Sequence, residues 1–142
     1  MLRIFLTALI LVQSSIAFAD AEGEIKYRKG VYQVVRGHMA AMGSMMRDGV
    51  YTENLAFHAN GMKDIATITP TVFPAGSGDG KTNALTAIWE QPGEFKAAMD
   101  KFVNAANGIA SAVESRDRAK IGGAMKALGG SCKNCHDNFK AD

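Results

Sequence analysis

The chain has 142 residues, of which 47% are hydrophobic and 21% charged, proportions that suit one compact domain. The 16 basic and 14 acidic side chains leave a formal net charge of +2. So weak a bias, without a basic run, argues against a nucleic-acid-binding protein. The 3 prolines and 15 glycines exclude collagen-like and low-complexity chains, and two cysteines are too few for a disulfide framework. Eight methionines and a modest aromatic share of 8% favour helices over sheets.

The first nineteen residues have the pattern of a secretory signal peptide. A positive charge at Arg3 precedes an apolar stretch at residues 4–12, and the small-x-small sequence AFA ends at Ala19. We expect cleavage there, which divides the chain into a signal peptide (residues 1–19) and an exported mature domain (residues 20–142). An uncleaved membrane anchor is the alternative. After cleavage no apolar stretch approaches the roughly 20 residues of a spanning helix, so we expect no membrane insertion.

Two helices are predicted before a long connection, because apolar residues recur there at intervals of three and four. The first helix covers residues 25–46 and stops before Gly49, and the second is capped by Thr52. The inward-facing residues are predicted to be Ile25, Arg28, Tyr32, Val35, Met39, Met42 and Met46 in the first helix, and Leu55, Ala59, Met62, Ile65 and Ala66 in the second.

The connection at residues 69–91 contains two prolines and a glycine-rich turn, and its Trp89 is predicted to be a packing anchor. A third helix follows from Pro92 to about Glu114, and Ser115 or Asp117 can cap a fourth. Their inward-facing residues are predicted to be Phe95, Ala98, Phe102, Ala105, Ile109 and Ala112, then Ile121, Ala124, Leu128, Cys132, Cys135 and Phe139. The expected fold is therefore all-α, an antiparallel four-helix bundle with one long connection between its second and third helices.

The sequence Cys132-Lys133-Asn134-Cys135-His136 is the motif that carries chemistry. A C-x-x-C-H run in an exported protein favours covalent attachment of one haem c. On a helix, positions i, i+3 and i+4 share a face, so both thiols can bond one haem while the histidine lies under its iron. The alternatives are a thioredoxin-like redox pair, a zinc site and a structural disulfide. Because 6 residues follow the histidine, any sixth iron ligand must come from upstream.

On these residues the mature chain resembles the cytochrome c′ family, the high-spin class II cytochromes c. The features that carry the resemblance are Lys26-Tyr27-Arg28 near the start, Ile88-Trp89 and Phe95 after the connection, and the motif close to the C-terminus. The resemblance implies thioether bonds at Cys132 and Cys135 and proximal ligation by His136.

Three further site residues are implied by the resemblance. Arg28 corresponds to the arginine near the haem propionates, and Tyr32 lies one turn later, facing the vacant side of the iron. Low-spin relatives have a ligating methionine at the Tyr32 position, so a tyrosine fits the high-spin branch. Lys140 stands where the family usually has arginine, which keeps the charge but loses the planar guanidinium.

The function implied is that of a periplasmic monohaem protein with five-coordinate iron, which binds nitric oxide and carbon monoxide and cycles one electron. The alternatives are a six-coordinate low-spin electron-transfer cytochrome of the same fold and a haem enzyme such as a peroxidase; we expect no enzyme activity. The redox partner is not identified by the sequence.

Other candidate groups are assigned to packing. Four methionines of the first helix, and the histidines His38 and His58, are not expected to bind iron; the methionines are Met39, Met42, Met45 and Met46. A homodimer is expected, because the first helix carries apolar residues that we place outside its inner stripe, namely Val31, Val34, Ala41 and Met45.

Overall fold

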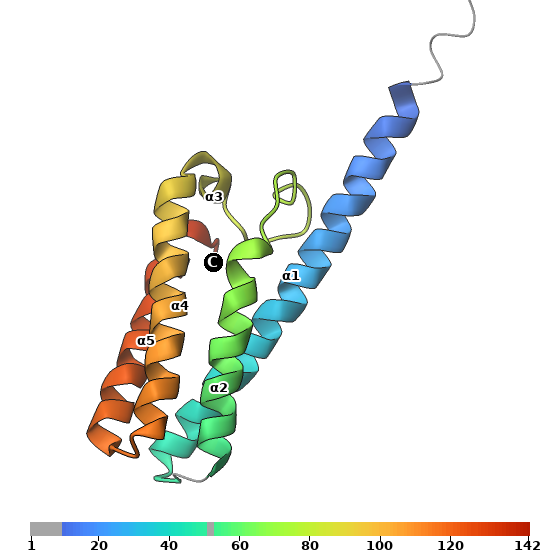
Figure 1. Ribbon diagram of the computed structural model, residues 1–142. Coiled ribbons are helices and arrows are strands. Elements are labelled where there is room, and N and C mark those ends of the chain that lie inside the picture. The colour runs from blue at the N-terminus through green and yellow to red at the C-terminus, as the bar shows by residue number, and fades with distance from the viewer. Residues whose placement is uncertain (1–9, 51–52) are drawn as a thin grey trace, which may run out of the picture.

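The computed structural model describes residues 10–50 and 53–142, with side chains from Ala21 onward. Its elements are α1 (Ile10–Arg47), α2 (Glu53–Ile68), the 3₁₀-helix η1 (Thr69–Thr71), α3 (Ala87–Glu90), α4 (Pro92–Glu114) and α5 (Arg118–Phe139). The four long helices α1, α2, α4 and α5 form the predicted bundle (Figure 1). The long connection runs between α2 and α4 and contains two short helices, which the sequence pattern did not predict.

Helix α1 begins earlier than predicted, at Ile10 instead of residue 25. Residues 10–24 contain no proline, so nothing interrupts the hydrogen bonds that continue the helix toward the N-terminus. Of the predicted signal peptide, residues 1–9 lie outside the described residues, and so does the predicted cap Thr52. Within the described residues, no helix is long and apolar enough to cross a membrane.

The other helix ends follow the expected local chemistry. Pro92 occupies the first turn of α4, where its missing N–H group costs no hydrogen bond. Of the two predicted caps of α5, the structure uses Asp117, whose side chain accepts hydrogen bonds from the backbone N–H groups of Ala119 and Lys120. Gly49, just after α1, has a positive φ of 69°, a conformation in which a side chain would be strained.

The main core lies along the bundle between the predicted apolar faces. Helix α2 packs against α1 and α4, and α4 packs against α5. The fully buried members include Met42, Leu55, Met62, Ile109 and Leu128. All five were predicted to face inward, so burial confirms the helical periodicity.

A second cluster fixes the connection at one end of the bundle. Its aromatic rings meet edge to face, with centroids 4.9 Å apart for Phe73 and Phe95 and 5.3 Å apart for Phe95 and Phe139. The indole Nε1–H of Trp89 donates to the carbonyls of Phe73 and Pro74, at 3.2 and 3.1 Å. Trp89 is therefore the packing anchor that was predicted.

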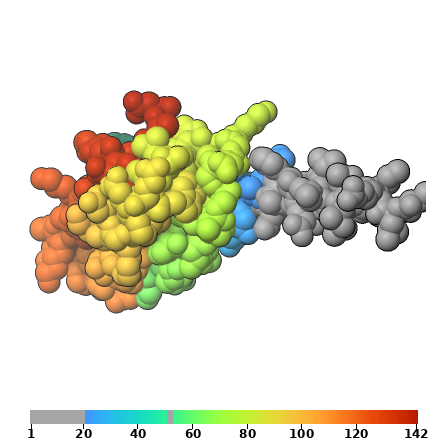
Figure 2. All heavy atoms as spheres, turned by 90° about the horizontal axis from the view of Figure 1, so that it is seen from above, coloured from blue at the N-terminus to red at the C-terminus, as the bar shows by residue number. Residues whose placement is uncertain are grey.

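The connection also pairs with the C-terminal end of the chain. Residues Ala84 and Lys140 form an isolated antiparallel bridge, with the Ala141 N–H group donating to the Asn83 carbonyl at 2.8 Å. Seen from above, the connection, the start of α4 and the C-terminal segment gather on the same face (Figure 2). This pairing places the connection beside the end of α5 that carries the C-x-x-C-H motif.

Candidate functional site

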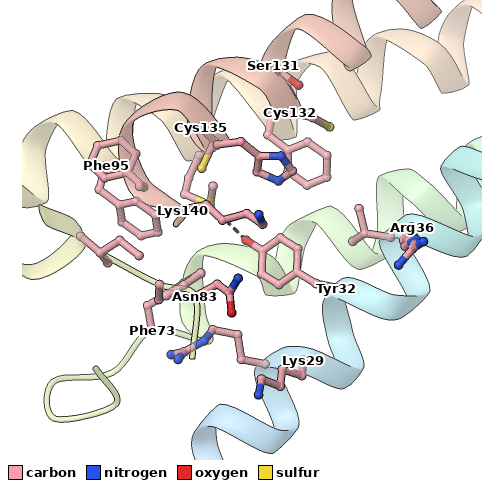
Figure 3. Close-up of a pocket in the computed structure, with 18 of the residues that line it drawn as sticks. Lys29, Tyr32, Arg36, Phe73, Asn83, Phe95, Ser131, Cys132, Cys135 and Lys140 are labelled. Atoms are coloured by element: carbon pink, nitrogen blue, oxygen red, sulfur yellow. Dashed lines mark hydrogen bonds between the residues drawn. The ribbon is translucent and has the colours of Figure 1, made fainter. Parts of the chain in front are cut away.

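A cavity of about 660 Å³ lies between α1, α4, α5 and the connection (Figure 3). This volume is typical of a site that holds a whole organic cofactor. The apolar part of its lining includes Val35, Met39, Phe73, Ile88, Phe95, Met99, Phe102 and Phe139. The cavity is also lined by all six site residues expected from the sequence: Arg28, Tyr32, Cys132, Cys135, His136 and Lys140.

Helix α5 supplies the two thiols and the imidazole from consecutive turns of one face. Both Cys132 and Cys135 are free and half-buried. Burial raises the pKa of the Cys132 thiol, and burial together with the neighbouring Cys132 raises the pKa of Cys135 to about 11. Both groups are therefore neutral thiols near neutral pH.

The environment of the two thiols bears on two alternative interpretations of the motif, a thioredoxin-like redox pair and a zinc site. A thioredoxin-like pair depends on a thiol with a lowered pKa, usually at a helix N-terminus, whereas these thiols have raised pKa values and lie late in α5. A structural zinc site needs about four ligands. Among the described residues, no group of three or more His, Cys, Asp or Glu side chains could hold a metal ion.

His136 presents an imidazole in its neutral, ligating form. Burial and the nearby Lys140 lower its pKa, against a smaller opposing effect of Asp137. Its side chain remains largely exposed on the side of α5 that lines the cavity. The group is therefore accessible from the cavity and does not need to lose a proton to bind a metal ion.

Tyr32 enters the same cavity from α1, toward the face of α5 that carries the cysteines (Figure 3). Its hydroxyl donates to the Met99 Sδ at 3.8 Å, and its ring meets the edge of Phe73 at a centroid distance of 6.0 Å. Burial, and next the nearby Cys135, raise the pKa of the phenol well above its ordinary value. Tyr32 is thus a neutral phenol held by apolar neighbours.

Arg28 has a structural role that sequence reasoning missed. It is 4% exposed, and its guanidinium stacks over the Phe73 ring at 4.9 Å. Its Nη1 donates to the Ser77 hydroxyl at 2.8 Å and its Nη2 to the Ser77 carbonyl at 2.9 Å. A further bond from Nη2 reaches the Thr82 hydroxyl at 3.0 Å. Arg28 therefore ties α1 to the connection while it lines the cavity.

Burial leaves Arg28 in a less polar environment than water, and this lowers the pKa of its guanidinium, against smaller effects of Tyr32 and Glu24. Lys140, by contrast, is exposed and lies just past the end of α5. Its ammonium group donates to the Ala141 carbonyl at 2.9 Å, and its side chain lines the cavity. The two predicted cations thus reach the cavity from different elements.

Several lining residues were not singled out from the sequence. Phe95 and Phe139 were predicted to face inward, but their place in the cavity depends on how the connection folds. Phe73 and Met99, which contact Tyr32, gave no signal: Phe73 lies in the irregular connection, and Met99 is adjacent to the predicted stripe of α4. Had the predicted apolar face of α4 been wider, it would have included Met99.

The methionines and histidines that the sequence analysis assigned to packing lie in different parts of the structure. Among the four methionines of α1, Met39 lines the cavity, and Met42, Met45 and Met46 pack in or against the main core. His38 and His58 contact each other and do not line the cavity. Val31, which we placed outside the inner stripe, is buried with 6% exposed, so that placement was wrong. The buried face of α1 is therefore wider than the set of inward-facing residues predicted from the sequence.

The cavity and its donors fit a covalently attached haem. An apolar space of this size suits a porphyrin, two neutral thiols on one helix face suit bonding to its vinyl groups, and an adjacent imidazole suits its iron. Tyr32 enters the space from the opposing helix.

Known proteins of one family are similar to this chain over most of its length. The model of the family described as Cytochrome C′ matches residues 23–140. Cytochrome c′ of Rhodospirillum rubrum is 40% identical over 126 residues, covering 87% of this chain and 86% of the relative. The solved structure of cytochrome c prime from Shewanella frigidimarina has a TM-score of 0.81 and 30% identity, covering 86% of this chain and 97% of that chain.

More distant structures share the fold. Cytochrome c prime of Alcaligenes xylosoxidans, as a variant with bound nitric oxide, has a TM-score of 0.80 at 23% identity, with coverage of 86% of this chain and 96% of that one. Another variant of that protein is a carbon monoxide complex, at 22% identity, TM-score 0.80 and coverages of 86% and 97%. A cytochrome c′ with ligand-controlled dimer dissociation has a TM-score of 0.80 at 21% identity, with coverages of 86% and 97%. With a family match over residues 23–140 and a relative at 40% identity, this chain belongs to the cytochrome c′ family.

Proposed function

We propose that this chain is a monohaem c-type cytochrome with five-coordinate iron, which binds nitric oxide and carbon monoxide and cycles one electron. The observation that carries the proposal is the position of Tyr32, a neutral and buried phenol on the side of the cavity opposite α5. The gas complexes of the Alcaligenes xylosoxidans protein support the choice of ligands.

The chain's own residues would hold the cofactor from α5. Cys132 and Cys135 would provide two thioether bonds, and the neutral imidazole of His136 would be the protein ligand of the iron. When bound, the haem supplies an iron centre that takes up a diatomic gas and changes between the ferrous and ferric states. Covalent attachment keeps the cofactor on a protein that works outside the cytoplasm, and it removes two reactive thiols.

Tyr32 would control the space on the other side of the cavity. Its phenol is a poor ligand for ferrous iron, and its raised pKa keeps the proton on the oxygen. Its ring, held between Phe73 and Met99, fills space that an incoming molecule needs. Small neutral gases need a modest side-chain shift, whereas larger ligands meet more of the ring.

The same environment gives no support to a haem enzyme. Cleavage of a peroxide bond requires a group that exchanges a proton near neutral pH close to the substrate. Tyr32, on the side of the cavity opposite α5, contacts Phe73 and Met99 and has a raised pKa. Cytochromes c′ are generally not enzymes, and we propose the same for this chain.

We propose a periplasmic location, from the signal peptide predicted at residues 1–19 and the typical location of the family. We also propose a homodimer formed through α1 and α2. With Val31 buried, the large apolar side chains that are exposed among the described side chains of these helices are Tyr27, Val34 and Phe57, which are 53%, 46% and 69% exposed. Tyr27 and Val34 lie two turns apart on one face of α1.

The test is an absorption spectrum of the purified holoprotein, oxidised, reduced and reduced under carbon monoxide. We expect a high-spin ferrous spectrum that changes on addition of the gas, and haem that stays on the chain through acid–acetone extraction. Haem that extracts freely would contradict attachment at Cys132 and Cys135.

A low-spin ferrous spectrum would instead support the six-coordinate alternative. The side chains of Met39 and Met99 line the cavity, and their sulfur atoms would be the candidates for a sixth ligand. The Tyr32 hydroxyl already engages Met99. Replacement of each methionine by leucine would then identify the ligand, because the low-spin spectrum would persist in one variant and vanish in the other.

A further inference from the structure

Two histidines meet between α1 and α2, which pack against each other (Figure 1). The Nδ1 atoms of His38 and His58 are 3.1 Å apart, and the ring centroids are 5.3 Å apart. Both side chains are half-buried. With His136 in the cavity, these are the remaining two of the three histidines in the chain. The pair therefore has no part in the proposed haem site.

The close approach of the two rings depends on a glycine. A Cβ atom at Gly61 would overlap the His38 ring, so the ring lies directly on the backbone of α2. Phe57 packs its edge against the ring of His58 at a centroid distance of 5.4 Å and lies 6.3 Å from that of His38. The rings are thus confined by a backbone on one side and an aromatic ring on another.

We propose that His38 and His58 form a second metal site, which binds one late first-row divalent ion (Cu²⁺, Ni²⁺ or Zn²⁺) through the two Nδ1 atoms. Imidazole nitrogen is the ligand type that these ions share. Because a metal–nitrogen bond is about 2.0–2.1 Å long, two nitrogens 3.1 Å apart subtend about 100° at a common ion. That angle lies between square-planar and tetrahedral coordination.

A change of tautomer would let a metal ion take the place of the hydrogen bond between the two rings. At present one ring donates its Nδ1–H to the other, which accepts. On binding, that proton moves to Nε2 of the same ring, so both Nδ1 lone pairs become available and no proton is released. The soft χ2 torsion of histidine lets each ring turn its lone pair toward one ion. Burial and the adjacent His58 lower the pKa of His38, which favours the neutral form.

The remaining coordination positions belong to water. Among the described residues no third His, Cys, Asp or Glu joins this pair. The site is consequently a two-ligand chelate, open to solvent, with an affinity below that of a structural zinc site. The affinity order is predicted to follow the general series, with Cu²⁺ bound more tightly than Ni²⁺ or Zn²⁺.

The probe is Cu²⁺ added to the ferric holoprotein, followed by calorimetry and by electron paramagnetic resonance. In the wild type we expect one Cu²⁺ per chain with superhyperfine splitting from two nitrogens. The titration uses dilute, monomeric protein, checked by sedimentation, because Phe57 also belongs to the proposed dimer surface.

Variants H38Q and H58Q should each lose about tenfold or more in Cu²⁺ affinity and lose the two-nitrogen signal, since removing outer contacts of a ligand alone costs that much. G61A should weaken binding by displacing the His38 ring, whereas G37A, where a Cβ has open space, is the matched control and should bind as the wild type does. The haem spectrum should be unchanged in all four variants.

Binding of Cu²⁺ by the H38Q/H58Q double variant with wild-type affinity would overturn the proposal. So would a wild type that shows no two-nitrogen signal at any protein concentration at which the monomer predominates. Because the haem spectrum is read separately, a failure of the copper site is distinguishable from a failure of the proposed gas-binding function.

Discussion

Tyr32 is the side chain whose contacts most directly concern gas binding. It must leave the edge of Phe73 and the sulfur of Met99 before a ligand can occupy its place. An aromatic pair contributes about 0.5–1.5 kcal/mol and a hydrogen bond about 1 kcal/mol. The barrier that Tyr32 adds to ligand entry is therefore of the order of 2 kcal/mol.

Replacing Tyr32 by alanine should accelerate carbon monoxide association by about tenfold or more, because that factor corresponds to about 1.4 kcal/mol of barrier. The high-spin ferrous spectrum should persist. Flash photolysis of the reduced protein under carbon monoxide measures the rate. Y32F is the matched variant: it keeps the ring but loses the hydrogen bond to Met99, so its rate should lie between those of the wild type and Y32A. An unchanged rate in Y32A would show that the ring does not limit access.

Arg28 holds the connection between α2 and α4 against α1, so its replacement should destabilise the protein. Its planar guanidinium donates from two nitrogens to Ser77 and Thr82, a geometry that a lysine ammonium cannot reproduce. R28K retains a buried charge with fewer partners and should lower the free energy of unfolding by about 1–3 kcal/mol.

Urea unfolding of the holoprotein, followed by circular dichroism, measures this change. R36K is the matched control, since Arg36 is an exposed cation of the same helix that also lines the cavity. Its substitution should change the unfolding free energy by less than about 0.5 kcal/mol. An equal decrease in the free energy of unfolding of R28K and R36K would contradict the stabilising role of the Arg28 hydrogen bonds.

Among the elements, α5 carries the cysteines and the histidine, so its stability matters to the site. Its first turn depends on Asp117, which accepts from two backbone N–H groups at 2.9 and 3.1 Å. These groups would otherwise have no partner within the helix.

D117A should lower the free energy of unfolding by about 1 kcal/mol, the usual cost of losing an N-cap. Thermal unfolding of the holoprotein gives the measurement. K126A, an exposed substitution within the same helix, is the control and should have little effect. A loss in D117A no larger than in K126A would contradict the contribution of the Asp117 cap to stability.

At the scale of the whole molecule, the proposed dimer depends on exposed apolar side chains of α1 and α2. Val34 on α1 and Phe57 on α2 expose apolar area that a dimer would bury, and each such side chain contributes about 1.5–3 kcal/mol when fully buried.

V34E and F57Q should each raise the dimer dissociation constant by about tenfold or more, measured by sedimentation. L85Q is the matched control, because Leu85 is also apolar and 37% exposed but lies on the connection. If the wild type sediments as a monomer at high concentration, or if L85Q dissociates the dimer as strongly, the surface is not the interface.

The sequence alone determined the number and the buried faces of the four long helices, and the motif, but not the early start of α1 or the short helices of the connection. Periods of three and four predicted the buried faces of all four long helices, because a helix repeats every 3.6 residues wherever it lies in a protein. The attachment motif is equally local, since Cys132, Cys135 and His136 share one helix face by spacing alone. Family resemblance supplied the places of Arg28, Tyr32 and Lys140 in the cavity lining.

The tertiary structure decided what those residues contact. The bonds of Arg28 to Ser77 and Thr82 span 49 and 54 residues, and the contact of Tyr32 with Met99 spans 67, so no local pattern encodes them. The burial of Val31 depended on how α1 packs against its neighbours. His38 and His58 each looked like an ordinary helix residue, and they became a pair because Gly61 lets α1 and α2 approach closely. Contacts between elements depend on packing geometry, which the periodicity of a single element does not contain.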